Sequence, residues 1–355
     1  MKRVNLALLV LGLGSLVYMV VKVGPGELLQ QVRALGWWGI ILLIVSEGAA
    51  NVAHTIGWRH CLGKPKGNLT LMRLFGINMA GYAVNYLTPT ASVGGEVSRA
   101  TLLASTEGGP KAVSSVLLDK LMTAMGHILV VVAGALFLFW RVSLPVQLWV
   151  AMAVTTGLLS VAMTVFLFLQ MHGKLGGLCR WLVEHNFGGN TLRTAAQQLS
   201  KVDQALKEFY SQHPRSLVLA VAWHFLGHSV AIFQAWLFLF LLGQPAPLAT
   251  VAAAGFLSLW FDLLTFAVPM NLGTLEGSRI VVFKALGCPA LLGIAFGVSV
   301  RIAQVFWACF GLVSYALMTS PAGGRFRLPT PPWRAPRQNS GLMEDPEVQP
   351  MDVLK

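Results

Sequence analysis

Two groups of charged residues recur at the same spacing within the most hydrophobic parts of the chain. The stretches 88-TPTASVGGEVSR-99 and 268-VPMNLGTLEGSR-279 both read Pro, six residues, Glu, one residue, Ser-Arg, at a constant offset of 180 residues. A carboxylate beside a guanidinium can form an ion pair, take up a proton or hold an anionic head group. The paired residues are Glu96 and Arg99 in the first copy and Glu276 and Arg279 in the second.

The residues around each Glu favour a break between two helices. Pro89 and Pro269 end the incoming helix, and glycines allow the chain to turn. A new helix then begins near the Glu, and its unpaired N–H groups beside an Arg suit a phosphate or carboxylate. The predicted substrate-binding residues are Arg99, Arg279, Glu96, Glu276, Ser98, Ser278, Gly94, Gly95 and Gly273. The alternative is that each Glu only caps its helix and each Arg neutralises it.

Charged side chains within a membrane need partners. A charge at the bilayer centre costs about 2.5–3.5 kcal/mol, so four unpaired charges would cost on the order of 10–14 kcal/mol. Glu and Arg three residues apart share a helix face. We therefore expect each motif to pair internally, or the two motifs to pair with each other, or the charges to line a wet cavity.

Other polar residues in apolar segments are candidates for a proton or ion path: Glu47, Asp119, Asp262 and Arg301. Asp119 and Lys120 are expected near a membrane surface, with their side chains extending to it. Asp262 is expected to face Arg301 or Arg279. His224 and His228 have metal-ligand spacing, but no third ligand accompanies them, so inter-helix hydrogen bonds are predicted rather than a metal site. No catalytic residue, metal or cofactor is predicted.

The composition indicates an integral membrane protein. The chain has 355 residues, is 55% hydrophobic and only 11% charged, and has a mean hydropathy of +0.66. Its long apolar runs do not alternate, which predicts helices rather than barrel strands. The net charge of +12 is explained by basic cytoplasmic loops, and nucleic-acid binding is not predicted. The four scattered cysteines form no Cys-x-x-Cys motif.

The apolar runs predict helices over these ranges: 5–22, 37–58, 70–87, 112–140, 147–169, 215–242, 248–267 and 290–318. One domain over 1–320 is expected, with an amphipathic cytoplasmic loop at 171–214. The Pro-rich tail at 321–355 is expected to be disordered and cytoplasmic.

The basic residues favour one of two topologies. If 70–87 crosses the membrane, the basic loop 171–214 lies outside, against the positive-inside rule. If 70–87 and 248–267 instead enter, turn at the motif and return, the loop and both termini are cytoplasmic. We therefore expect an all-α bundle with an inverted-topology repeat, whose cores are about 70–140 and 248–318, containing two re-entrant helical hairpins.

These motifs resemble the lysylphosphatidylglycerol synthase transmembrane (flippase-like) family. The similarity rests on the Gly-Gly-Glu-x-x-Arg core ending at Arg99, the Leu-Gly-x-x-Glu-Gly core at 272–277, the residues 57–59 and Gly287. It covers about 1–320. The residues 269–273 read Pro-Met-Asn-Leu-Gly, where the family pattern is closer to Pro-Gly-Gly-Leu-Gly. The resemblance implies a domain that translocates lipids, and this chain has no room for an attached synthase domain.

Three functions are therefore weighed. The leading one is a lipid translocator in the bacterial inner membrane, which moves a phospholipid, hopanoid or polyprenyl-type lipid between leaflets. In it Arg99 and Arg279 bind the head group, while Glu96 and Glu276 orient them or take up protons. The others are a non-transporting partner of a lipid-synthesising enzyme and a membrane-embedded head-group transferase.

Overall fold

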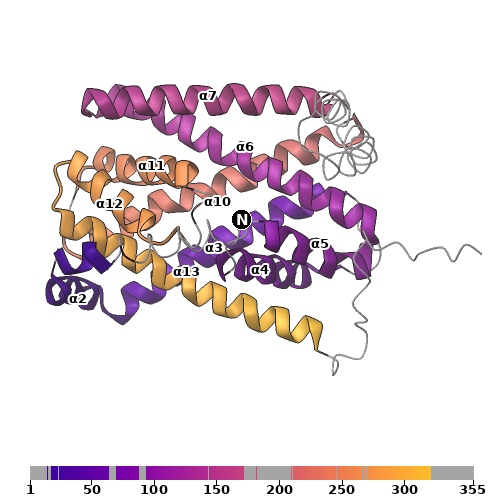
Figure 1. Cartoon of the computed structure of the whole chain (residues 1–355), viewed down its shortest axis with the longest axis horizontal. Helices are drawn as coiled ribbons and strands as arrows, with labels where there is room; N and C mark the ends of the chain where they lie inside the picture. The colour runs from indigo at the N-terminus through magenta and orange to yellow at the C-terminus, as the bar shows by residue number, and fades with distance from the viewer. Residues whose placement is uncertain are drawn as a thin grey trace, which may run out of the picture.

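The computed structural model describes residues 14, 17–22, 24–63, 69–87, 93–142, 144–171, 181, 209, 211–244, 246–265, 268 and 271–320. Within these ranges all regular elements are helices (Figure 1). The helices are α2 (Pro25–Ala34), α3 (Gly36–Cys61), α4 (Leu71–Leu87), α5 (Val93–Glu107), α6 (Gly109–Arg141), α7 (Val146–Met171), α10 (Pro214–Leu241), α11 (Leu248–Thr265), α12 (Thr274–Ala285) and α13 (Ala290–Thr319).

Six of these helices are long and apolar enough to cross a membrane. They are α3, α6, α10, α11, α13 and the 146–165 part of α7. Helix α4 has 17 residues and is not among them. The structure therefore confirms an all-helical membrane protein, and the long helices begin and end within three residues of their predicted bounds. Helix α2, which Pro25 starts, was not predicted. Most of the predicted helix 5–22, of which only residues 14 and 17–22 are described, most of loop 171–214 and the whole tail lie outside the described residues.

Each sequence motif lies at a junction between two packed helices. Helices α4 and α5 contact each other, as do α11 and α12, and we call these pairs the first and second hairpin. Helix α4 ends at Leu87, just before Pro89. The second hairpin lies toward the left-hand end of the bundle in Figure 1 and the first toward the right-hand end. The long helices α6 and α13 follow the two hairpins in the chain.

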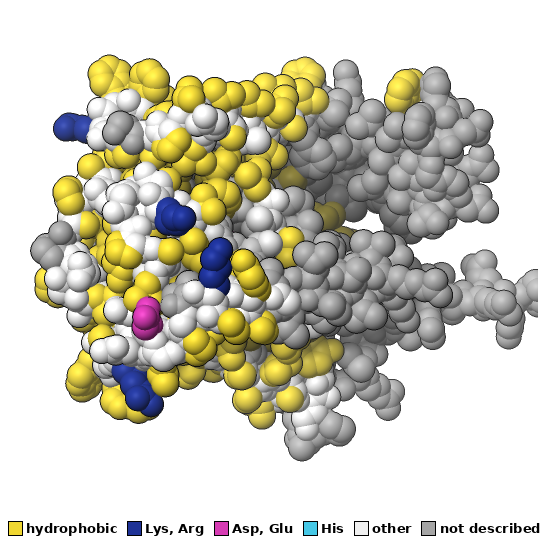
Figure 2. Space-filling model, turned by 60° about the vertical axis from the view of Figure 1, so that its left-hand side comes forward, with side chains coloured by type: hydrophobic (Ala, Val, Ile, Leu, Met, Phe, Trp, Pro, Cys, Tyr) yellow, Lys and Arg dark blue, Asp and Glu magenta, His cyan; other side chains and the backbone are white. Residues whose placement is uncertain are grey.

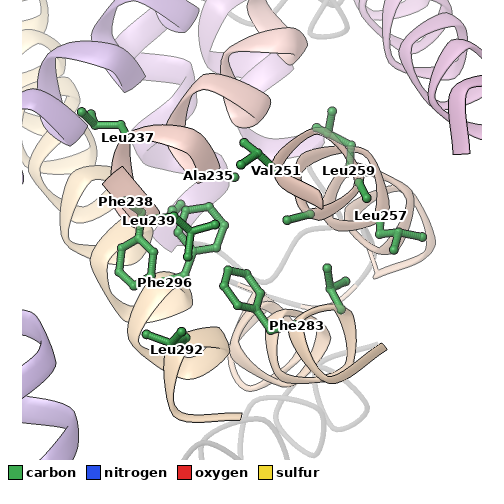
Figure 3. Packing of buried hydrophobic residues seen from close by; sticks show 14 of the residues in the cluster. Ala235, Leu237, Phe238, Leu239, Val251, Leu257, Leu259, Phe283, Leu292 and Phe296 are labelled. Carbon is green, nitrogen blue, oxygen red and sulfur yellow. The ribbon is translucent and has the colours of Figure 1, made fainter. Parts of the chain in front are cut away.

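Two apolar clusters stabilise the two ends of the bundle. One surrounds the second hairpin, where Phe238, Phe283 and Phe296 pack with ring centroids 5.2–6.5 Å apart (Figure 3). The other surrounds the first hairpin and is built on residues such as Trp58 and Leu74. Helices α3, α6 and α10 contribute to both clusters. On each of these three helices, polar residues separate the two apolar stretches, so a polar layer lies between the clusters.

The outer surface is apolar. Large side chains along the long helices are exposed, among them Phe139, Leu158 and Val161. On the face drawn in Figure 2, hydrophobic side chains and uncharged atoms cover most of the described surface, with a few scattered Lys, Arg and acidic side chains. Helix α7 lies at one edge in Figure 1, and little of its apolar surface is buried. Such a surface is stable against lipid tails rather than water.

Candidate functional site: two hairpins with paired charges

The arginine of the first hairpin is buried in an ion pair. Arg99 Nη2 donates to Asp119 Oδ2 at 2.5 Å, and both side chains are almost fully enclosed. The guanidinium also lies 3.9 Å from the centre of the Trp58 ring on α3, in a cation–π contact. Its Nε has no partner among the described residues. Three helices thus hold one cation in place.

The glutamate of the first hairpin is more open. Glu96 Oε1 accepts from Lys120 Nζ at 2.8 Å, and 52% of the Lys120 side chain is exposed. Asn85 of α4 donates to the other Glu96 oxygen at 3.3 Å and accepts from the Gly95 N–H at 2.6 Å. Asn85 therefore ties α4 to the start of α5. Ser98 donates to the Gly94 carbonyl, a bond within its own helix.

The arginine of the second hairpin pairs with the preceding helix. Arg279 Nη1 and Nη2 donate to the two oxygens of Asp262 at 2.7 and 2.8 Å. Nη1 also donates to the Ser258 carbonyl at 3.3 Å and to Ser278 Oγ at 3.0 Å. The Asp262 side chain is 26% exposed, so this pair borders an accessible region. As at Arg99, Nε has no partner among the described residues.

The glutamate of the second hairpin is sealed. Glu276 is fully buried and pairs with Arg301 of α13 through both oxygens, with Arg301 Nη2 at 3.0 Å from Oε2. The Gly273 N–H donates to the same carboxylate at 3.2 Å, so Glu276 also caps α12. Gly273 adopts φ 72°, the left-handed conformation that glycine tolerates best. Arg301 further donates to Tyr86 of α4 at 3.3 Å.

The expected pairing within or between the motifs was wrong. Each charged motif residue instead bonds a residue of another helix, because α6, α11 and α13 offer a counter-charge at contact distance. The expectation that Asp262 faces Arg279 is confirmed. Asp119 is buried rather than extended to a surface, whereas its neighbour Lys120 is exposed. The alternative that the glutamate caps its helix holds for Glu276. The motif arginines, Arg99 and Arg279, do not neutralise the motif glutamates.

Glu47 is not a member of any of these four pairs. Its carboxylate accepts from Gln234 Nε2 of α10 at 2.9 Å, and Gln234 also donates to Ser46. The predicted inter-helix bonds of His224 and His228 are confirmed: His224 bonds Asp119 of α6 at 3.1 Å, and His228 bonds the Thr123 carbonyl at 3.3 Å. Among the described residues, no group of three or more His, Cys, Asp or Glu could hold a metal ion.

Trp58, Asn85 and Tyr86 had not been predicted as partners of the charged groups. Sequence offers little signal for them, because each reads as an ordinary residue of an apolar helix. Only the Gly-Trp-Arg run at 57–59, part of the family resemblance, pointed to Trp58.

Comparison with known proteins gives one family. The sequence model described as the lysylphosphatidylglycerol synthase TM region matches residues 5–311. A relative described as a UPF0104 membrane protein, from Methanothermobacter thermautotrophicus, is 24% identical over 319 residues. The alignment covers 86% of this chain and 93% of that protein. No solved structure matches.

Proposed function

Because the chain belongs to the lysylphosphatidylglycerol synthase TM region family, we propose that it moves a lipid between the leaflets of a membrane. The lipid carries an anionic or polar head group, on a phospholipid, hopanoid or polyprenyl-type tail. The observation that carries this proposal is the pair of hairpins, each with a buried Arg held by an Asp. In a bilayer such costly groups are retained mainly for function.

The proposed topology is an inverted repeat with two re-entrant hairpins. Its support is that the hairpins lie toward opposite ends of the bundle (Figure 1) and that α4, with 17 residues, is shorter than each of the six candidate spans. The N-terminus, loop 171–214 and the tail then share the cytoplasmic side, which we propose is that of a bacterial inner membrane. A cysteine introduced by Asn190→Cys in that loop should be labelled only from the cytoplasm. Labelling only from outside would refute this topology.

A head group can bind Arg99 or Arg279 only if it replaces the aspartate that pairs with that arginine. Arg99 and Arg279 are buried behind Asp119 and Asp262, so an anion reaches them only when an Arg–Asp pair opens. Lys120 is the most exposed cation of the four pairs and offers the first contact on the side of the first hairpin. An incoming anion that takes Lys120 from Glu96 would loosen the start of α5, which also carries Arg99. The second hairpin would release the head group by the reverse exchange.

The test is lipid movement in vesicles that contain the purified protein. Dithionite quenches fluorescent phosphatidylglycerol in the outer leaflet but does not reach the inner leaflet. A loss of the protected fluorescence therefore reports transfer of the lipid to the outer leaflet. We expect wild type to transfer the lipid and Arg99→Ala with Arg279→Ala to abolish transfer. Arg73→Ala, at an exposed arginine of α4, is the matched control and should keep wild-type rates. An active double variant would refute the roles of both arginines.

The same preparation separates the two other candidates. Formation of a modified lipid by the purified protein would support a head-group transferase. A partner of a lipid-synthesising enzyme would show no lipid transfer alone, and would lose its function in cells on deletion of 171–214 but not on substitution in the hairpins.

A further inference from the structure

Four imidazole rings form a continuous row in the polar layer between the two apolar clusters. His224 and His228 come from α10, His54 from α3 and His127 from α6. Along the row His224, His54, His228, His127, successive ring centroids are 5.2, 4.7 and 4.4 Å apart. The Nδ1 atoms of His54 and His224 lie 2.9 Å apart, within hydrogen-bond distance. Three helices thus bring their histidines to one line.

Each end of the row reaches one of the Arg–Asp pairs. His224 Nε2 lies 3.1 Å from Asp119 Oδ1, and the other oxygen of Asp119 holds Arg99. At the far end His127 Nε2 donates to the Leu259 carbonyl of α11 at 2.9 Å. Asp262 follows Leu259 by one helical turn on α11. The row therefore extends from the carboxylate that holds Arg99 toward the carboxylate that holds Arg279.

The surrounding backbone leaves room for the rings. A Cβ atom on Gly57 would lie 2.7 Å from His224 Nε2, and one on Gly227 would lie 2.7 Å from a His54 ring carbon. On Gly126 it would lie 2.8 Å from His224 Cβ. Glycine at these three positions lets α3, α6 and α10 approach closely while imidazoles lie between them. The row is thus enclosed by neighbouring helices.

We propose that this row is a proton path that connects Asp119 with Asp262, and that it couples the motion of the two hairpins to proton movement. Imidazole suits this task because it accepts a proton on one nitrogen and releases another from the second. A proton entering from Asp119 binds His224, and each ring passes one on until His127 releases one to Asp262. One proton enters and one leaves, and the rings then turn to restore their original tautomers.

Proton arrival would act on the ion pairs directly. A protonated Asp119 or Asp262 no longer neutralises its arginine, so the guanidinium becomes available to an anionic head group. Among the described residues, the charged groups that interact with the row are Asp119 from α6, Arg99 from α5 and Asp262 from α11. Cys61 of α3 lies close enough to interact with Asp119 and Arg99. The use of the path in transport rests on the proposed function, whereas proton passage itself does not.

The experiment measures proton flux and lipid transfer in the same vesicles. Purified full-length protein is reconstituted in phosphatidylethanolamine and phosphatidylglycerol with pyranine inside, and valinomycin with a potassium gradient sets the voltage. We expect wild type to pass protons faster than protein-free vesicles. His54→Gln and His228→Gln interrupt the row at different links and should reduce the flux to the protein-free rate. His60→Gln, on α3 but outside the row, is the matched control.

Each outcome bears on a different statement. Proton flux without lipid transfer keeps the proton path and refutes the translocator. Wild-type flux equal to that of protein-free vesicles overturns the path, whatever the lipid does. Each His variant is first shown to be folded by a size-exclusion elution profile like that of wild type. If either folded variant then passes protons at the wild-type rate, the row has only a structural role. A slower flux in D₂O for wild type but not for His54→Gln would support the path further.

Discussion

In the first hairpin the enclosed ion pair contains the motif arginine, and in the second it contains the motif glutamate. Arg99 and Asp119 are both buried, while Glu96 forms an ion pair with the exposed side chain of Lys120. In the second hairpin Glu276 is sealed against Arg301, and the Asp262 side of the arginine pair is accessible. Each hairpin therefore combines one closed pair and one open pair, with the roles of the two motif charges exchanged.

This difference between the two hairpins follows from which helix carries the partner aspartate. Asp119 lies on the helix after its hairpin, whereas Asp262 lies on the first helix of its own hairpin. At the offset of 180 residues that relates the motifs, Asp119 corresponds to Ser299 and Asp262 to Tyr82. The counter-charges are thus not repeated, although the motif is. For the proposed translocator, ends with different pairing would help to keep both sides from opening at once.

The largest effect is expected from removing the sealed glutamate. Glu276→Ala leaves Arg301 without its carboxylate, which should cost about 3–5 kcal/mol of stability because a buried charge then lacks its partner. Glu96→Ala is the matched change in the first hairpin and should cost less than about 1 kcal/mol, because the Glu96–Lys120 pair is partly exposed. Thermal unfolding in detergent measures both. Equal losses would remove the asymmetry between the hairpins.

A smaller and opposite difference is expected at the aspartates. Asp119→Asn should cost about 2–3 kcal/mol, because Arg99 and His224 both lose a charged acceptor in a buried site. Asp262→Asn should cost less, about 1 kcal/mol, because 26% of the Asp262 side chain is exposed and the amide that replaces it can be solvated. The order of the two unfolding midpoints is the readout. A less stable Asp262→Asn variant would contradict the assignment of open and closed pairs.

The helix crossings should differ as well. A Cβ on Gly95 would overlap the Gly81 carbonyl and the Asn85 side chain, so Gly95→Ala should cost about 1–3 kcal/mol through overpacking. A Cβ on Gly277 would meet only the flexible end of Met19, at 3.0 Å. Gly277→Ala should therefore be neutral or slightly stabilising, since alanine favours a helix. Loss of stability in Gly277→Ala but not in Gly95→Ala would contradict this difference between the two positions.

The smallest contribution is the cation–π contact between Arg99 and the Trp58 ring. Trp58→Phe weakens the cation–π contact and should cost about 0.5–1 kcal/mol beyond the loss of packing. Among the described residues no aromatic ring lies over Arg279, so the second hairpin has no equivalent change. Repeating Trp58→Phe in an Asp119→Asn background separates the two contributions. Strict additivity would show that Trp58 and Asp119 act on Arg99 independently.

The sequence predicted the parts of this arrangement that follow from composition and repetition. Apolar runs located the long helices, and the repeated motif located both hairpins and the arginines. The partners of those arginines could not be predicted, because they depend on which faces of α6, α11 and α13 meet the hairpins. Asp119 shows the reason. Because it adjoins Lys120, the sequence predicted a charge near the membrane surface, but neighbouring residues of a helix point in different directions, so Asp119 is buried while Lys120 is exposed.

The hydrogen bonds of Arg301 to both hairpins restrict how the hairpins can move. Its guanidinium bonds Glu276 in the second hairpin and Tyr86 in the first, besides the Asn271 carbonyl at 2.9 Å. One side chain therefore links the two hairpins. Any motion that parts the hairpins must first break the bonds of Arg301 to one of them, so in the proposed translocator these bonds would oppose the opening of the bundle.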